Sequence, residues 1–161
     1  MYYSTDYTSP LGEMLLVSDG EAICGLWFYG QKHFKSTIDD DLIEKSDLDI
    51  FKKATKWLDE YFKGINPEID FKLKPRGSEF RLRVWKILAE IPYGKTTTYG
   101  EISSRISPEM SAQAVGGAVG HNPISIMLPC HRVLGSDGKL TGYAGGIERK
   151  IELLKLEKVK L

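Results

Sequence analysis

The residues best suited to chemistry lie in one stretch, Asn122 to Val133, where Cys130 stands directly before His131 and Arg132. A free thiol with a pKa of about 8.5 is only a few per cent thiolate at neutral pH, and a nearby base or positive charge raises that fraction. Cys130 has both kinds of neighbour, so the sequence predicts a nucleophile there. The other cysteine, Cys24, lies in an apolar run and is predicted to be a small core residue.

His131 is the candidate base for Cys130. Neighbouring side chains on extended backbone point to opposite sides, so a direct contact between the two is not expected. A bridging water, or a turn at this point, would let the imidazole accept the thiol proton. A third group should then orient the ring. Glu157, at the end of an apolar helix pattern, is one candidate, and the sequence alone leaves this choice open.

The first third of the chain is predicted to form a small β-sheet. Apolar runs at 14–17 and 22–28 flank Asp19-Gly20, a hairpin pattern, and residues 2–7 are predicted to form a preceding strand. Residues 36–46 are polar and are expected to form a loop. Apolar residues at helical spacing predict a helix over about 47–63, ended by Gly64. The aperiodic segment 65–77 is interpreted as a linker.

The second half is predicted to be mainly helical. Ser78 is a candidate cap for a helix whose apolar face is Phe80, Val84, Ile87, Leu88 and Ile91. Thr98 to Glu101 match the capping-box pattern of a helix that reaches about residue 106. After a turn at 107–110, residues 111–118 predict a second short helix, and the pair is typical of a helix-turn-helix. A last helix is expected from Ile147 to about Glu157, with an apolar face of Ile147, Ile151, Leu154 and the aliphatic carbons of Lys158.

The helix at 111–118 is unusual because most of its side chains are tiny. Helices that read the major groove carry arginine or amide side chains for base edges, whereas this one offers mainly alanine and glycine. Such a surface permits close approach of another helix, which is one interpretation. The other is approach to a narrow minor groove, where small residues discriminate poorly between sequences.

The order of the predicted elements and the distribution of charge indicate the fold class, the domains and the kind of partner. The fold class is α+β, with domains predicted at 1–76 and 77–161. The net charge is zero, but residues 1–70 hold 7 basic and 14 acidic side chains and residues 71–161 hold 15 and 8. The basic half is a candidate surface for a polyanion, although solvated lysine-rich helices explain it equally well.

No apolar run is long enough for a membrane span, and the first residues lack a secretion pattern. Two isolated cysteines favour a reducing, cytoplasmic setting.

The motif Pro129-Cys130-His131-Arg132-Val133, with an aliphatic run before it and Asn122-Pro123 upstream, resembles the O6-alkylguanine-DNA alkyltransferase family. The likeness extends from about Ser78 to Glu157 and includes the segment 142–146, whereas the first 70 residues match only in outline. It implies a ribonuclease H-like N-terminal domain. It also implies direct, single-turnover transfer of an alkyl group from O6-alkylguanine, with O4-alkylthymine as a further candidate, to the protein's own cysteine.

The resemblance assigns catalytic roles to Cys130, His131, Glu157, Asn122 and Tyr99. Cys130 would accept the alkyl group, and His131 would act as its base through a water, held by Glu157. Asn122 would support the turn around the nucleophile. Tyr99 would press on the DNA phosphate and donate a proton to guanine O6. Arg132 would be structural.

The partner implied is double-stranded DNA containing O6-alkylguanine, bound through its minor groove by a protein expected to be monomeric. Predicted DNA and base contacts are Ala112, Gln113, Ala114, Gly116, Tyr143, Ala144, Gly145 and Gly146. The likeness calls for neither an organic cofactor nor a metal, and the histidines and cysteines have no zinc spacing. One position departs from the family: where an arginine usually precedes Ala-Val-Gly, this chain has Gln113, which is shorter and uncharged.

Two other functions are compatible with the sequence. The first is a non-reactive protein that marks alkylated DNA, although its known kind lacks the cysteine that this chain has. The second is a cysteine hydrolase that uses Cys130 and His131 as a dyad. The first would bind damaged DNA without being modified, and the second would turn over small esters or peptides without DNA.

Overall fold

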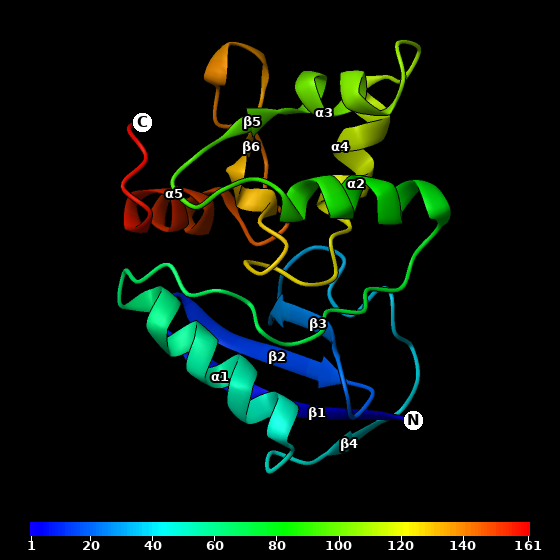
Figure 1. Ribbon diagram of the computed structural model, residues 1–161, viewed down its shortest axis with the longest axis vertical. Coiled ribbons are helices and arrows are strands. Elements are labelled where there is room, and N and C mark those ends of the chain that lie inside the picture. Colours follow the sequence, from blue (N-terminus) through cyan, green and yellow to red (C-terminus); the bar gives the residue numbers. More distant parts are fainter. The chain divides into compact units, whose positions relative to one another are not determined.

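The computed structural model describes residues 1–161, which divide into two units. Unit 1 consists of residues 1–76 together with Pro123–Ser125. Unit 2 consists of residues 77–122 and 126–161. The fold is α+β, with the sheet in unit 1 and most of the helices in unit 2, as predicted (Figure 1).

Unit 1 is built on a four-stranded sheet in the order β3-β2-β1-β4. Its strands are β1 (Tyr2–Ser9), β2 (Gly12–Ser18), β3 (Ile23–Phe28) and β4 (Leu42–Glu44). β1, β2 and β3 pair antiparallel in sequence, so the hairpin predicted around Asp19-Gly20 is confirmed. The Asp19 carboxylate accepts hydrogen bonds from the backbone N–H groups of Glu21 and Ala22, which stabilises the turn.

Side chains alternate between the two faces of this sheet along each strand, so buried residues lie on both faces. One face carries a cluster of Leu15, Val17, Cys24, Trp27 and Ile38, so Cys24 is a core residue as expected. The helix α1 (Asp49–Phe62) covers the other face, as its Asp59 accepts a hydrogen bond from Tyr7 of β1 at 2.7 Å. Figure 1 shows α1 lying along the sheet.

Three pairings in unit 1 were not predicted. The expected loop at 36–46 contains β4, which runs parallel to β1. Within the expected linker, Leu73 forms a parallel bridge with Ile23. On β3, Leu26 exchanges backbone hydrogen bonds with the segment Pro123–Ser125, from Leu26 N to Pro123 O at 2.8 Å and from Ser125 N to Leu26 O at 2.9 Å. These short pairings join residues that are distant in sequence, so no local sequence pattern predicts them.

Unit 2 contains four α-helices that begin close to the predicted caps. They are α2 (Glu79–Ala89), α3 (Tyr99–Ile106), α4 (Ala112–Gly120) and α5 (Ile147–Leu156). Ser78, Thr98 and Ser111 each accept a hydrogen bond from the backbone N–H three residues ahead, as N-cap side chains do. Trp85 of α2 donates to the carbonyl of Ala118 at 2.8 Å and so ties α2 to α4.

A short parallel pair and two 3₁₀ turns complete unit 2. The strands β5 (Thr97–Thr98) and β6 (Val133–Leu134) pair with each other, and the turns are η1 (Cys130–Arg132) and η2 (Ser136–Gly138). None of the helices in the structure combines the length and the apolar character that a bilayer crossing demands.

The predicted apolar face of the last helix was partly wrong. Ile147 is 39% exposed and Lys158 is also exposed, whereas Lys150, Leu153 and Leu154 are fully buried. Lysine is seldom fully buried, because its ammonium is costly to bury without partners. Lys150 has such partners, and they come from outside its helix.

Candidate active site

Cys130 begins the 3₁₀ turn η1 and is buried, with 5% of its surface exposed. The expectation of extended backbone at this point was wrong, and the structure has the turn that was the alternative. The N–H of Arg132 donates to Pro129 O at 3.0 Å, which closes the turn. Cys130 and His131 are therefore placed by a tight turn rather than on opposite sides of a strand.

His131 and Arg132 both engage the carboxylate of Glu157, the residue that ends α5. His131 Nε2 lies 2.7 Å from Glu157 Oε2, with both side chains fully buried. Arg132 donates from Nε to Glu157 Oε1 at 2.8 Å and from Nη2 to Oε2 at 3.1 Å. Among the carboxylates of this half, the structure thus brings Glu157 to the imidazole.

The backbone at Gly94 completes the environment of Glu157. Gly94 N–H donates to Glu157 Oε1 at 2.9 Å, and Gly94 has φ +77°, a conformation that a side chain would strain. Arg132 also donates from Nη1 to Ile91 O at 2.6 Å. Arg132 therefore holds the carboxylate in place, in line with a structural role.

These contacts set the charge states of the pair. Burial raises the pKa of Glu157, but the hydrogen bonds from His131, Arg132 and Gly94 outweigh it and hold that pKa at about 2. Burial lowers the pKa of His131, and the adjacent Glu157 offsets this only in part. At neutral pH the array is a neutral imidazole beside a carboxylate, which is the form that can accept a proton.

Burial raises the pKa of the Cys130 thiol, and three side chains counteract it. They are the amide of Asn122, the ammonium of Lys150 and the hydroxyl of Tyr143. Asn122 also donates from Nδ2 to Leu128 O at 2.6 Å, which holds the chain just before the nucleophile. Asn122 is therefore close to both the thiol and the turn. Lys150 was not among the site residues predicted from the sequence.

Tyr99 opens α3 and lies beside α4. A Cβ built on Gly116 would be 3.9 Å from the Tyr99 ring, and the Thr141 hydroxyl donates to the Tyr99 hydroxyl at 3.4 Å. Tyr99 is half-buried.

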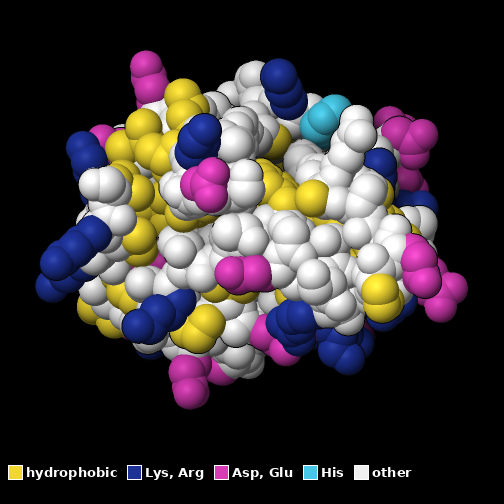
Figure 2. All heavy atoms as spheres, turned by 90° about the horizontal axis from the view of Figure 1, so that it is seen from above, with side chains coloured by type: hydrophobic (Ala, Val, Ile, Leu, Met, Phe, Trp, Pro, Cys, Tyr) yellow, Lys and Arg dark blue, Asp and Glu magenta, His cyan; other side chains and the backbone are white.

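The predicted DNA-contact residues of α4 lie at the surface. Ala112, Gln113, Ala114 and Gly117 are exposed and Gly116 is half-buried, while Val115, Ala118 and Val119 face the interior. A Cβ added to Gly117 would meet nothing within 4 Å. Tight packing within unit 2 therefore does not account for the small residues on this face. Figure 2 shows one face of the molecule, with lysine and arginine interspersed among acidic side chains and uncharged surface.

The segment Tyr143 to Gly146 leads directly into α5. Gly146 is the N-cap of that helix with φ +95°, and its N–H donates to Tyr143 O at 2.8 Å. Tyr143 and Ala144 are half-buried, and Gly145 is buried. Of these residues, only Tyr143 has a side chain that acts on Cys130.

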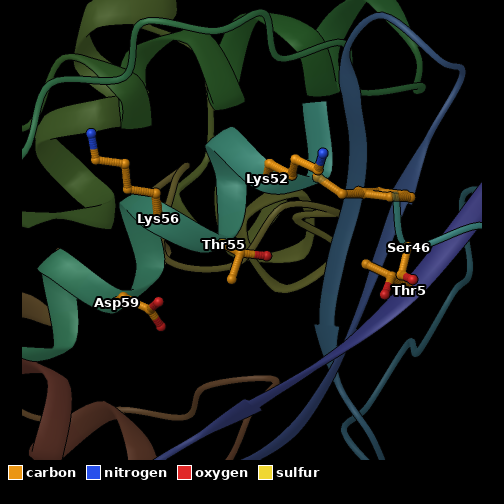
Figure 3. Close-up of a pocket in the computed structure, with 7 residues that line it drawn as sticks. Thr5, Ser46, Lys52, Thr55, Lys56 and Asp59 are labelled. Carbon is orange, nitrogen blue, oxygen red and sulfur yellow. The ribbon is translucent and has the colours of Figure 1, made fainter. Parts of the chain in front are cut away.

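A separate pocket of about 420 Å³ lies in unit 1 between α1 and the sheet (Figure 3). It is lined by Thr5, Ser46, Phe51, Lys52, Thr55, Lys56 and Asp59, none of which was a predicted site residue. Its one carboxylate, Asp59, accepts the hydrogen bond from Tyr7. Its lining contains no cysteine or histidine. No group of three or more His, Cys, Asp or Glu side chains in the chain is arranged to hold a metal ion.

Two family models together span almost the whole chain. The model described as the DNA binding domain of 6-O-methylguanine DNA methyltransferase matches residues 79–159. The model for the ribonuclease-like domain of the same protein matches residues 1–75.

Individual proteins of known name are similar to this chain over nearly its full length. The methylated-DNA–protein-cysteine methyltransferase of Methanosarcina acetivorans is 45% identical over 98% of this chain and 98% of its own length. That of Haemophilus influenzae is 42% identical, over 98% of this chain and 87% of its own.

Solved structures show the same likeness at the level of the fold. The O6-methylguanine methyltransferase of Mycobacterium tuberculosis superposes with a TM-score of 0.85 at 44% identity, covering 98% of this chain and 93% of its own. A structure of OGT from that organism in complex with DNA gives a TM-score of 0.84 at 45% identity, covering 98% and 92%.

Proposed function

Because this chain belongs to the 6-O-methylguanine DNA methyltransferase family, we propose that it repairs DNA by moving an alkyl group from guanine O6 to its own Cys130. The observation that carries this proposal is the buried array in which Cys130 stands on a turn beside His131, whose imidazole is held 2.7 Å from Glu157. This array lies within the segment matched by the DNA-binding family model.

The proposed chemistry follows from the charge states. Glu157 engages Nε2, so the thiol proton passes through a water to Nδ1 of the neutral His131, and the imidazolium is stabilised by the carboxylate. The Cys130 thiolate attacks the alkyl carbon, and a carbon–sulfur bond forms as the carbon–oxygen bond to O6 breaks. The bonding electrons leave with guanine, which Tyr99 protonates. The thioether has no return route, so each molecule acts once.

Access to the sulfur requires the base to leave its helix. O6 lies inside the base stack and Cys130 is buried, so the nucleotide must rotate out of the duplex, at a cost of a few kcal/mol that is smaller for a damaged base. In this proposal α3 and α4 act as a helix-turn-helix, and the exposed small residues of α4 enter the minor groove. Tyr143 and the residues up to Gly146 wall the everted base.

Gln113 occupies the exposed position on α4 from which a side chain would fill the gap in the duplex. Its amide hydrogen-bonds the orphaned base without adding charge. The protein is proposed to act as a monomer in the cytoplasm, in keeping with its two free cysteines.

The test is to mix the protein with a short duplex that carries one O6-methylguanine and then to measure the intact protein mass. We expect a gain of one methyl group per chain. Peptide mapping should place this group on Cys130. Cys130→Ala should gain nothing, while Cys24→Ala, the matched control, should react like the wild type.

The same assay distinguishes the rivals. Binding to the duplex without a mass change would identify a marker of alkylated DNA. Release of methyl groups in many turnovers, with the protein unmodified, would point to a hydrolase. Either result would overturn the proposal.

A further inference from the structure

The hydroxyl group of Tyr99 has one hydrogen-bond partner in the structure, the side chain of Thr141. The Thr141 hydroxyl donates and the phenolic oxygen accepts, at 3.4 Å. The phenolic O–H therefore makes no hydrogen bond within the protein, which leaves its proton available to a substrate. Thr141 was not among the site residues predicted from the sequence, because it lies 42 positions from Tyr99.

Tyr99 is held in place by two neighbouring elements. The parallel pairing of Thr98 with Leu134 fixes the start of α3, so Tyr99 lies beside the end of β6. Its ring lies next to Gly116 of α4, where an added Cβ would be 3.9 Å from the edge of the ring. These contacts fix the position of the ring but not the direction of the hydroxyl proton.

The loop after β6 fixes the position of Thr141. Gly135 N–H donates to Lys139 O at 2.8 Å, which closes the loop and returns Thr141 to the end of β6. A Cβ built on Gly135 would be 2.7 Å from Thr141 Cγ2, which is closer than side chains pack. Gly135 has φ −72° and ψ 175°, which any residue adopts, so glycine is needed here for space and not for conformation. The methyl group of Thr141 occupies that space, and this sets the rotamer that directs the hydroxyl to Tyr99.

We propose that Thr141 is a positioning residue that prepares Tyr99 to give its proton to the departing guanine. This inference rests on the proposed repair of O6-alkylguanine. The Thr141 hydroxyl occupies a lone pair of the phenolic oxygen, so the O–H of Tyr99 is directed to the substrate. When the carbon–oxygen bond of the alkyl group breaks, the O–H bond of Tyr99 breaks as well, and the proton moves to guanine. The remaining phenolate keeps the hydrogen bond from Thr141, which strengthens as charge develops, and it later takes a proton from water.

The test compares two reactions of Cys130, of which only one needs a proton from Tyr99. Transfer from an O6-methylguanine duplex needs this proton, whereas alkylation by iodoacetamide releases iodide, which needs none. Thr141→Val keeps the shape of the side chain but removes the donor, so single-turnover methyl transfer at saturating duplex should fall roughly tenfold. The iodoacetamide rate should stay at that of the wild type. Thr141→Ser keeps the hydroxyl and should retain methyl transfer.

Gly135 supplies an independent test of the same geometry. Gly135→Ala should also slow methyl transfer, because its Cβ displaces the Thr141 methyl group and turns the hydroxyl away. Serine has no such methyl group, so Thr141→Ser introduced into Gly135→Ala should restore the rate. If the loop served packing alone, two changes would be worse than one. A double variant slower than Gly135→Ala would therefore overturn the proposal.

A double-mutant cycle shows whether Thr141 acts through Tyr99. In Tyr99→Phe, methyl transfer should be slow, and adding Thr141→Val should slow it no further. A further loss of about the same size would contradict the proposal, and so would equal losses with methylguanine and iodoacetamide. Thr8→Val, which changes an exposed threonine of β1, is the matched control and should have no effect.

The hydrogen bond itself can be observed without DNA. The ¹³Cζ resonance of Tyr99, assigned with Tyr99→Phe, should shift in Thr141→Val and not in Thr141→Ser. An unchanged resonance in Thr141→Val would refute the contact, whether or not the protein repairs DNA. If the wild type gains no methyl group from the duplex, the proposed function is wrong and the role of Thr141 falls with it, while the resonance still reports the contact.

Discussion

The imidazole of His131 and the carboxylate of Glu157 lie 2.7 Å apart, and neither side chain is exposed at the protein surface. The two residues are 26 positions apart in sequence, and the end of α5 brings them together. The carboxylate fixes which ring nitrogen faces it, so the other nitrogen is directed to proton transfer. This relationship gives the first prediction.

Glu157→Gln should slow alkylation of Cys130 by about tenfold or more, because the amide cannot stabilise an imidazolium. Single-turnover rates with O6-methylguanine duplex at neutral pH measure this effect. Glu152→Gln, an exposed change in the same helix, is the matched control and should have no effect. A Glu157→Gln protein as fast as the wild type would remove Glu157 from the mechanism.

The protein should lose stability in acid. The pKa of Glu157 is lowered from 4.5 to about 2, so its stabilising contribution is complete above about pH 5 and disappears as the pH falls towards 2. The shift corresponds to about 3 kcal/mol of unfolding free energy. The lowered pKa of His131 acts in the same direction below 6.5, because the unfolded chain gains a proton that the folded protein resists.

Urea unfolding across this pH range measures the loss. Glu157→Gln removes the titrating carboxyl and should flatten the acid limb, although it lowers stability at neutral pH. A wild-type curve that is level between about pH 6 and 3 would contradict the assigned charge states.

Gln113 should matter only for DNA. Gln113→Arg is expected to speed repair of O6-methylguanine in a duplex, because a longer, charged side chain fills the gap better. Gln113→Ala should slow it. Both variants should react with free O6-benzylguanine at the wild-type rate, since Gln113 is exposed on α4. Equal changes with the two substrates would argue against a role in base eversion.

Gly117 tests whether the small residues of α4 form a contact surface. Gly117→Ala should raise stability by up to about 1 kcal/mol through helix propensity, because the added Cβ has open space. It should leave DNA affinity nearly unchanged. Gly117→Leu should fold equally well but bind duplex DNA at least about tenfold more weakly, as a bulky side chain obstructs a narrow groove. Fluorescence anisotropy at fixed salt gives both affinities, and equal values would exclude α4 from the interface.

The features of the fold that were predicted are those with local causes. The Asp19-Gly20 hairpin and the helix starts at Ser78, Thr98 and Ser111 each depend on residues within a few positions of one another. β4 and the Ile23–Leu73 bridge were missed because their partners are remote and their segments polar or aperiodic.

The site was predictable to a similar degree. Cys130 and His131 could be identified from adjacent residue types, and Glu157 needed the family resemblance to be selected. Lys150 was missed because a lysine in an amphipathic helix is normally exposed, and no local pattern reveals that Val133 and Thr141 offer it carbonyls.

The segment Pro123–Ser125 limits how this protein can be divided into fragments. Its residues pair with Leu26 of β3, so the sheet of unit 1 is completed by a piece of chain that is synthesised about a hundred residues later. A fragment that stops at Arg76 would leave that edge of β3 open, with unpaired backbone groups free to join a neighbouring molecule. No single cut of the polypeptide yields both units intact, and a newly made chain cannot finish its first unit until most of the second has been translated.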